Sequence, residues 1–229
     1  IVLETPIIGR GPVEDIMKDD WYRMGLNGFL ADTGNFNNKN RPGDRWDKIQ
    51  KELGVEMLPW VEDKDRGDYV LVALQLPGDA SLKGINISKW AYDTCHKIRK
   101  HTDRPIVIRT PQLPRQFDEN TLYKLTVEID DIQFQQGSKS NLNRAIDDAW
   151  CTVTYSSGLG VDSVMRGIPT FAMDSANFAY DLGNTDLSNI ESPNLINRDQ
   201  WVKDLSYAQW SIKEISRGTP WLHMKELLG

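Results

Sequence analysis

Residues Tyr155–Phe171 read YSSGLGVDSVMRGIPTF, and this stretch indicates the fold most clearly. The apolar segment Ala149–Tyr155 leads into a small polar loop. An amphipathic stretch over Gly160–Arg166 and a second apolar segment, Pro169–Met173, follow it. Strand, short loop, helix and strand in this order are typical of a parallel βαβ unit.

The same alternation extends toward the N-terminus. Tyr69–Gln75 (YVLVALQ) is a continuous apolar run, as expected for a strand that is buried on both faces. The other expected elements are a helix over Ile87–Lys100, a strand over Pro105–Arg109, a helical turn at Asp118–Leu122, a short strand near Leu125–Glu128, a helix over Asn141–Asp148, and C-terminal helices over Asp199–Ala208 and Ser211–Arg217. We therefore predict an α/β fold with a doubly wound, Rossmann-like parallel sheet in a domain over residues 67–229.

Residues 1–66 differ in amino-acid composition from the rest of the chain. They are rich in Gly, Asn, Asp and Pro, and Asn35–Pro42 is a loop by composition. Only Arg45–Leu53 shows helical spacing of its apolar residues. We predict a separate, irregular N-terminal segment.

Composition excludes several classes of protein. The 229 residues include 27 Lys and Arg against 33 Asp and Glu, and the net charge of −6 argues against a generic basic nucleic-acid coat. Two Cys and three His, without metal-ligand spacing, predict neither a disulfide framework nor a metal site. No apolar run approaches the roughly 20 residues that span a bilayer, and the first residues lack the features of a signal peptide. We expect a cytoplasmic protein without a membrane span.

Parallel sheets bind ligands at the carboxyl ends of their strands. The loops expected there are Leu76–Leu82, Thr110–Arg115, Ser156–Gly160 and Asp174–Phe178. Ser156, Ser157 and Gly158 lie where a strand ends and a helix begins, which suits a phosphate, and Asp162 follows where a carboxylate can accept hydrogen bonds from a ribose diol. An ordinary turn with a serine N-cap would have the same sequence pattern.

Three segments resemble a known family. The spacing Ser-x-x-x-x-Asp-Ser-x-x-x-Gly-x-Pro from Ser157 to Pro169 resembles the donor-binding element of GT-B glycosyltransferases, with Asp162 in place of the usual Glu. Val70–Gly84 resembles the segment that opens the nucleotide-binding half of capsule-polysaccharide synthesis (Kdo-transferase-like) enzymes. Asp103–Pro111 resembles the strand before their His-Pro loop, with Thr for the His. The tail Tyr207–Trp221 is similar to phage and bacterial members.

The resemblance implies the C-terminal, nucleotide-binding half of a GT-B enzyme, with residues 1–66 as a remnant of the acceptor domain. The rest of that domain would then lie upstream, on a partner chain, or not exist. The substrates would be a nucleotide sugar and a polysaccharide or hydroxymethylated phage DNA, with no metal or other cofactor. If the loops meet at one sheet edge, the donor-binding residues are Gln75, Ser81, Arg109, Ser156, Ser157, Gly158 and Asp162.

Glycosyl transfer also needs a base for the acceptor hydroxyl, and carboxylates commonly serve. Asp79 in the Pro-Gly-Asp turn and Glu4 are the candidates, although an Asp in such a turn also serves as a simple cap. Two other functions stay open. One is a non-catalytic nucleotide-sugar-binding or structural subunit, and the other is a sugar-nucleotide epimerase or hydrolase.

Overall fold

A computed structural model describes residues 1–9, 20–111 and 117–228. It divides the chain into two compact units. The larger unit is Met57–Leu195, and the smaller unit combines Ile1–Glu56 with Ile196–Gly229. This division differs from the predicted domains 1–66 and 67–229. The reason is that β8 (Gln209–Ser211) pairs antiparallel with β2 (Trp21–Gly25), so the C-terminal segment completes a sheet with N-terminal residues.

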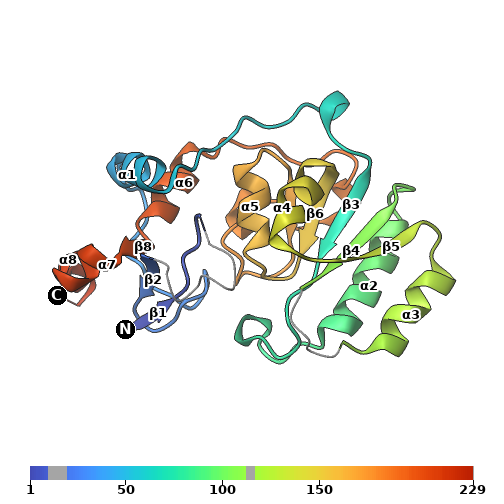
Figure 1. Cartoon of the computed structure of the whole chain (residues 1–229), viewed down its shortest axis with the longest axis horizontal. Helices are drawn as coiled ribbons and strands as arrows, with labels where there is room; N and C mark the ends of the chain where they lie inside the picture. Colours follow the sequence, from blue (N-terminus) through green and yellow to red (C-terminus); the bar gives the residue numbers. More distant parts are fainter. Residues whose placement is uncertain (10–19, 112–116, 229) are drawn as a thin grey trace. The chain divides into compact units, whose positions relative to one another are not determined.

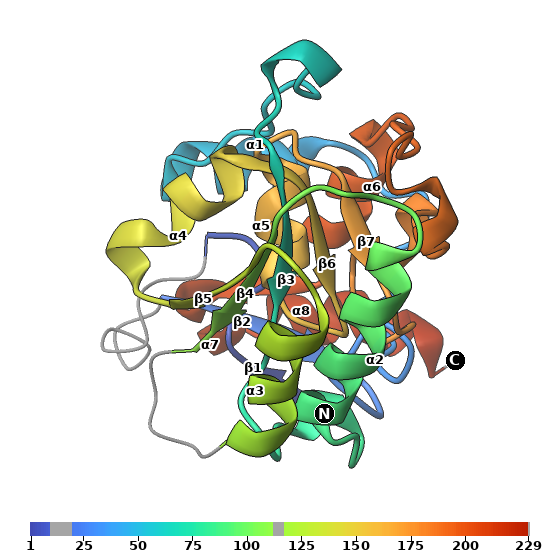
Figure 2. The ribbon, with the colours of Figure 1, turned by 90° about the vertical axis from the view of Figure 1, so that its right-hand side faces the viewer.

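The larger unit contains a five-stranded parallel sheet in the order β5-β4-β3-β6-β7 (Figure 1; β7 is labelled in Figure 2). Its strands are β3 (Tyr69–Ala73), β4 (Ile106–Thr110), β5 (Ile132–Gln136), β6 (Ala149–Thr154) and β7 (Thr170–Ala172). Its helices are α2 (Ile87–Arg99), α3 (Glu119–Glu128), α4 (Lys139–Asp147) and α5 (Leu159–Met165), with 3₁₀ helices η2 (Asp63–Asp65), η3 (Ala80–Leu82), η4 (Tyr180–Leu182) and η5 (Leu187–Asn189). The predicted α/β fold with a Rossmann-like parallel sheet is confirmed.

Helices cover both faces of this sheet (Figure 2). Because side chains alternate along a strand, Val70 and Val72 of β3 pack into one cluster with α2 and α3, whereas Leu71 packs into another with α4. All three are fully buried, as are Ile106 and Ile108 of β4, which lie in register with Val70 and Val72. The continuous apolar run is thus the central strand of a three-layer core.

One predicted strand is wrong. Residues near Leu125–Glu128 belong to helix α3, where Leu122 and Leu125 are buried three positions apart and the Asp118 side chain caps the helix by accepting from the Thr121 N–H. The strand comes later, as β5. It lies at the edge of the sheet with the sequence IQFQQ, so it carries little of the apolar signal of a central strand.

The order of the strands fixes where a ligand would be expected. From β3 the chain proceeds outward to β4 and β5, then returns to the other side of β3 to form β6 and β7. The direction of winding therefore reverses between β3 and β6, where Ala73 lies in register with Thr154. In open α/β sheets, ligands bind outside the carboxyl ends of the strands at such a topological switch point.

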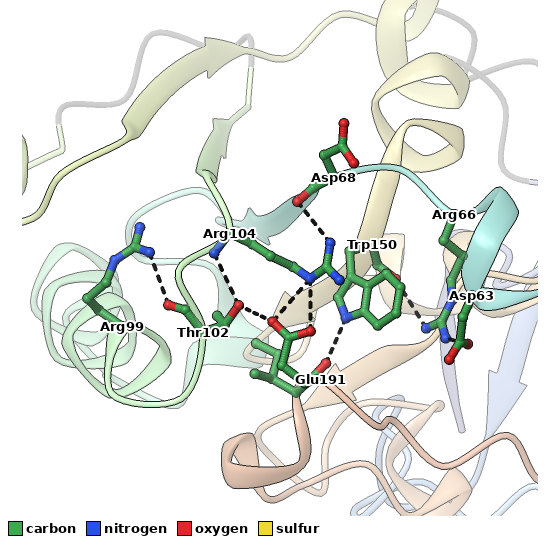
Figure 3. Close-up of polar contacts among 9 residues, drawn as sticks. Asp63, Arg66, Asp68, Arg99, Thr102, Arg104, Trp150 and Glu191 are labelled. Atoms are coloured by element: carbon green, nitrogen blue, oxygen red, sulfur yellow. Dashed lines mark hydrogen bonds and ion pairs between the residues drawn. The ribbon is translucent and has the colours of Figure 1, made fainter.

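At the opposite end of β6, Trp150 holds the start of the strand in place (Figure 3). The guanidinium groups of Arg66 and Arg104 lie 3.8 and 3.7 Å from the centre of its ring, and its Nε1–H donates to the Ile190 carbonyl at 2.8 Å. Glu191 accepts from Arg104 at 3.1 Å. This end of the sheet is therefore tied together by structural contacts.

The smaller unit has an antiparallel sheet in the order β1-β2-β8. Its remaining elements are β1 (Val2–Glu4), α1 (Asp44–Leu53), α6 (Asp199–Ser206), α7 (Ile212–Ser216), α8 (Thr219–Met224) and η6 (Lys225–Leu227). The helix predicted at Arg45–Leu53 is confirmed as α1. Two strands, β1 and β2, form within the segment predicted to be irregular, and Met24 and Trp210 pack into the core of this unit.

Candidate functional site

Side chains from the loops after β3 and β6 are hydrogen-bonded to one another across the switch point. Gln75 and Ser156 each lie two residues beyond the register pair Ala73 and Thr154. The Gln75 Nε2 group donates to Ser156 Oγ at 3.0 Å, and its Oε1 accepts from the Ser156 backbone N–H at 3.0 Å. One amide therefore joins the two central strands at their carboxyl ends.

The loop after β3 extends this network. Gln75 Nε2 also donates to Ser81 Oγ at 2.5 Å, and Ser156 Oγ donates to the Ser81 carbonyl at 3.0 Å. The Asp79 carboxylate accepts from both the N–H and the hydroxyl of Ser81, at 2.8 and 2.7 Å, as the N-cap of η3. We call Gln75, Asp79, Ser81 and Ser156 the switch-point network. Four of the nine predicted site residues thus come together.

The loop after β6 has most of its backbone donors occupied. The Ser156 N–H is held by Gln75, the Ser157 N–H donates to Thr154 Oγ1 at 3.2 Å, and the Leu159 N–H donates to Ser157 Oγ at 3.3 Å. The acceptors are all side-chain oxygens. A phosphate that binds these N–H groups would have to displace them.

Gly158 stands at the exposed end of this loop. It is the N-cap of α5 with φ −58°, and a Cβ placed on it would meet no atom within 4 Å. A side chain at this position is therefore compatible with the fold. Any requirement for glycine here would come from a ligand.

A further set of polar residues lies at the same edge, and none of them is among the nine predicted site residues. Asp174 follows β7, accepts from the Tyr155 hydroxyl at 2.9 Å, and lies 3.3 Å from the Lys83 Nζ. Asn177 donates to the Ser157 carbonyl at 3.3 Å. Asp174 and Asn177 belong to the predicted edge loop Asp174–Phe178, whereas Lys83 lies one residue beyond the loop predicted after β3.

The hydrogen bonds of Arg109 go to β5 and to the start of α4 instead of to the switch-point network. The strand β4 continues to Thr110, so Arg109 lies inside it and points to the face that α4 covers. Its guanidinium donates to Gln135 Oε1 at 2.8 Å and to the Ser138 carbonyl at 2.7 Å, and the residue is 6% exposed. Burial also lowers the pKa of Arg109. Most of the predicted loop Thr110–Arg115 lies outside the described residues.

Two other predicted residues belong to α5 and to β1. Asp162 is in the first turn of α5, half-buried, with its N–H donating to the Gly158 carbonyl at 3.2 Å. Glu4 is in β1 of the smaller unit, where its carboxylate accepts from the Thr5 N–H at 2.8 Å. Their predicted roles, ribose recognition and base, stay predictions.

The cysteines, possible metal ligands and helix lengths of the described residues were compared with the needs of thiol chemistry, metal binding and membrane insertion. Burial raises the pKa of Cys95 to about 12 and raises that of Cys151 as well, so neither thiol is ionised near neutral pH. Among residues 1–9, 20–111 and 117–228, no three His, Cys, Asp or Glu side chains are grouped as metal ligands. Nor does any helix in these ranges have the length and apolar character needed to cross a membrane.

Comparison with known proteins shows a related fold. No protein-family model matches the sequence, and no curated protein sequence matches it either. Among solved structures, the chain is similar to the β-Kdo 2,7-transferase of Thermosulfurimonas dismutans KpsC, with a TM-score of 0.53 and 16% identity, over 96% of this chain and 77% of that one. The β-Kdo 2,4-transferase of the same protein aligns with a TM-score of 0.49 and 12% identity, over 82% and 64%. The first likeness establishes the fold.

Proposed function

We propose that this chain is a glycosyltransferase that binds a nucleotide sugar at the switch-point network. The observation that best supports this proposal is the set of hydrogen bonds by which Gln75 joins Ser81 and Ser156, at the point where the strand order reverses. Parallel sheets of this topology hold nucleotides at that point. The fold shared with a Kdo transferase supports the choice of reaction.

In this proposal the donor lies against the loop after β6. Ser156, Ser157 and Gly158 surround its phosphate, which replaces the side-chain oxygens that now accept from the loop N–H groups. Asp162 accepts from the ribose hydroxyls. Arg109 has no part in the proposed site, since its guanidinium is bound on the α4 face.

The proposed reaction breaks the bond between the anomeric carbon of the sugar and the donor phosphate oxygen. A bond forms from that carbon to an acceptor hydroxyl oxygen, and the hydroxyl proton passes to a base, for which Asp79 and Glu4 are the candidates. The nucleotide leaves with the phosphate oxygen, and no metal or other cofactor is included. The net charge of −6 favours a carbohydrate acceptor over DNA.

A second candidate function is a nucleotide-sugar-binding subunit without catalysis. The observation in its favour concerns Asp79, whose Oδ1 is occupied by two hydrogen bonds from Ser81 and therefore serves as a cap. Both functions require the donor site. They differ only in whether the sugar is transferred to an acceptor.

A thermal-shift screen with UDP, CMP, GDP and dTDP sugars tests the donor site. We expect one of these nucleotide sugars to raise the melting temperature, and calorimetry then gives its affinity. No shift with any of the four would contradict the proposal.

The variant Gly158→Val tests whether the nucleotide sugar binds at the loop after β6. Because the position is open, the variant should fold normally and lose at least tenfold in donor affinity, about 1.4 kcal/mol. Gly43→Val is the matched control. Gly43 is also a helix N-cap in the right-handed region, with φ −82°, but it belongs to the smaller unit. Equal donor affinity in both variants would place the donor elsewhere.

A further inference from the structure

Lys83, Asp174 and Tyr155 form a polar group beside the switch-point network. The Lys83 Nζ lies 3.3 Å from Asp174 Oδ1, and the Tyr155 hydroxyl donates to Asp174 Oδ2 at 2.9 Å. The Ala176 N–H donates to Oδ1 at 3.0 Å. The three side chains come from the segments after β3, β6 and β7.

Covalent neighbours place this group next to the proposed donor site. Lys83 follows Ser81 by two residues, and Tyr155 directly precedes Ser156; both serines belong to the switch-point network. In the loop after β7, Asn177 donates to the Ser157 carbonyl at 3.3 Å. The Lys83 ammonium therefore stands at the sheet edge where the donor phosphate is proposed to lie.

Lys83 can exchange its ion pair with Asp174 for a contact with a ligand. The side chain of Lys83 is 38% exposed and that of Asp174 is 21% exposed, so the pair is reached by solvent and the interaction is weak. If Lys83 turned away, the carboxylate would still accept from Tyr155 and Ala176. A terminal monophosphate or a diphosphate carries more negative charge than a carboxylate and is the stronger partner for an ammonium group.

The backbone at Lys83 is also unusual. Its φ of 51° and ψ of 35° are left-handed, a region that residues with a Cβ rarely adopt. Such conformations persist where the surroundings enforce them, and they are frequent at ligand sites. Here the conformation ends η3, with the Lys83 N–H donating to the Ala80 carbonyl at 3.2 Å.

From these observations we infer that Lys83 binds the phosphate of the nucleotide, and that Asp174 holds the ammonium group until the phosphate takes its place. The inference rests on the proposed function, because it concerns the same donor site. It supplies the cation that the sequence had assigned to Arg109. The ligand class is a nucleoside monophosphate or diphosphate, free or joined to a sugar.

The test compares a nucleotide with its own nucleoside, using the nucleotide that gives the largest shift in the screen. Lys83→Gln should weaken nucleotide binding about tenfold or more, because one charged contact is lost, and should change nucleoside binding by less than about twofold. Lys83→Arg should keep most of the affinity. Asp174→Asn should strengthen nucleotide binding, since it removes the ion pair that competes for Lys83 and takes a negative charge away from the site.

Lys89→Gln is the matched control. Lys89 forms an exposed ion pair with Asp93 at 2.6 Å on α2, and its replacement should change neither affinity. If the wild type binds a nucleotide and Lys83→Gln leaves the nucleotide-to-nucleoside affinity ratio unchanged, the inference is overturned and the proposed function stands. If Asp174→Asn and Lys83→Gln weaken binding of both ligands equally, the pair is structural and the inference is again overturned. Failure of every nucleotide to bind the wild type overturns both.

Discussion

At the scale of single residues, the switch-point network uses each polar atom in a way that a close substitute would not reproduce. The Gln75 amide donates through Nε2 to two hydroxyls and accepts through Oε1 from a backbone N–H. A carboxylate at this position could accept but could not donate. The sequence predicts this residue through its place after a buried strand, but the hydrogen-bond pairing itself depends on the register of β3 and β6.

Asp79→Asn separates catalysis from capping. The amide keeps an oxygen that can accept from the Ser81 N–H, so the turn and the donor affinity should be retained. If Asp79 is the base, turnover should fall by a factor on the order of 10² to 10⁴, because an amide cannot take the proton. Steady-state rates with donor and acceptor, alongside donor calorimetry, check this. Near-normal turnover would leave Asp79 as a cap and move the base to Glu4 or outside this chain.

Arg109 shows where prediction at the residue scale ends. Its place as the last residue of the predicted strand Pro105–Arg109 suggests a cation at the sheet edge. In the structure its side chain points to the same face as Val107, which packs with α4, because side chains alternate along β4. Its hydrogen-bond partners, Gln135 and the Ser138 carbonyl, come from β5 and the start of α4, which the pattern around Arg109 does not reveal. Lys83 was not predicted as a site residue. Its position depends on η3 and on its own left-handed backbone conformation, and the sequence pattern reveals neither.

At the scale of elements, Glu214 joins α1, β8 and α7 in the smaller unit. Its carboxylate accepts from Arg45 of α1 at 3.0 Å and from the Ser211 N–H at the end of β8 at 2.9 Å. Burial by itself would raise the pKa of Glu214, but the hydrogen bonds from Arg45, Lys48 and Ser211 outweigh it and lower the pKa to about 2. The charged form is therefore favoured in the folded protein.

The sign of the pH effect follows from this lowered pKa. Above the ordinary value of 4.5 the carboxylate stabilises the fold in full, and the contribution is lost as pH falls toward 2, because the unfolded chain takes up the proton first. The difference corresponds to about 3 kcal/mol of unfolding free energy. Urea unfolding of the wild type and Glu214→Gln should differ most near neutral pH and converge in acid. Glu52→Gln, at a 45% exposed partner of Lys48, should show little difference at any pH.

The elements also show why some of the fold could be predicted and some could not. Central strands such as β3 are apolar throughout, and helices such as α2 bury one face, so their patterns are strong. The edge strand β5 and the short strands β1 and β8 bury little of their own surface or contain few residues. They form because a partner strand supplies hydrogen bonds, which is information that lies elsewhere in the chain.

At the scale of the whole molecule, the division into units could not be predicted for a similar reason. The change in composition near residue 66 is real, but it does not mark the boundary. Residues after Ile196 return to the unit of the N-terminal segment, and Arg45 of α1 donates to the Gln209 carbonyl of β8 at 2.5 Å. A pairing between segments more than 160 residues apart leaves no local pattern in the sequence.

The first residues of the larger unit are held to the end of α5, and Gly167 makes this possible. The Leu58 N–H donates to the Met165 carbonyl at 2.8 Å, and the Val61 N–H donates to the Gly167 carbonyl at 2.9 Å. Gly167 has φ +79°, and a Cβ on it would lie 2.0 Å from the Pro59 carbonyl oxygen. Such a distance forces the two backbones apart.

Gly167→Ala should therefore lower the free energy of unfolding by about 3 kcal/mol or more, from backbone strain and the clash together. Gly183→Ala is the matched control, because Gly183 has φ +81° but no atom within 4 Å of the added Cβ, and strain alone should cost about 1 to 2 kcal/mol. Urea unfolding measures both, and hydrogen exchange at the Leu58 and Val61 amides should rise in Gly167→Ala only. Equal losses in the two variants, with unchanged exchange at these amides, would show that the close approach of Pro59 to Gly167 does not hold this segment in place.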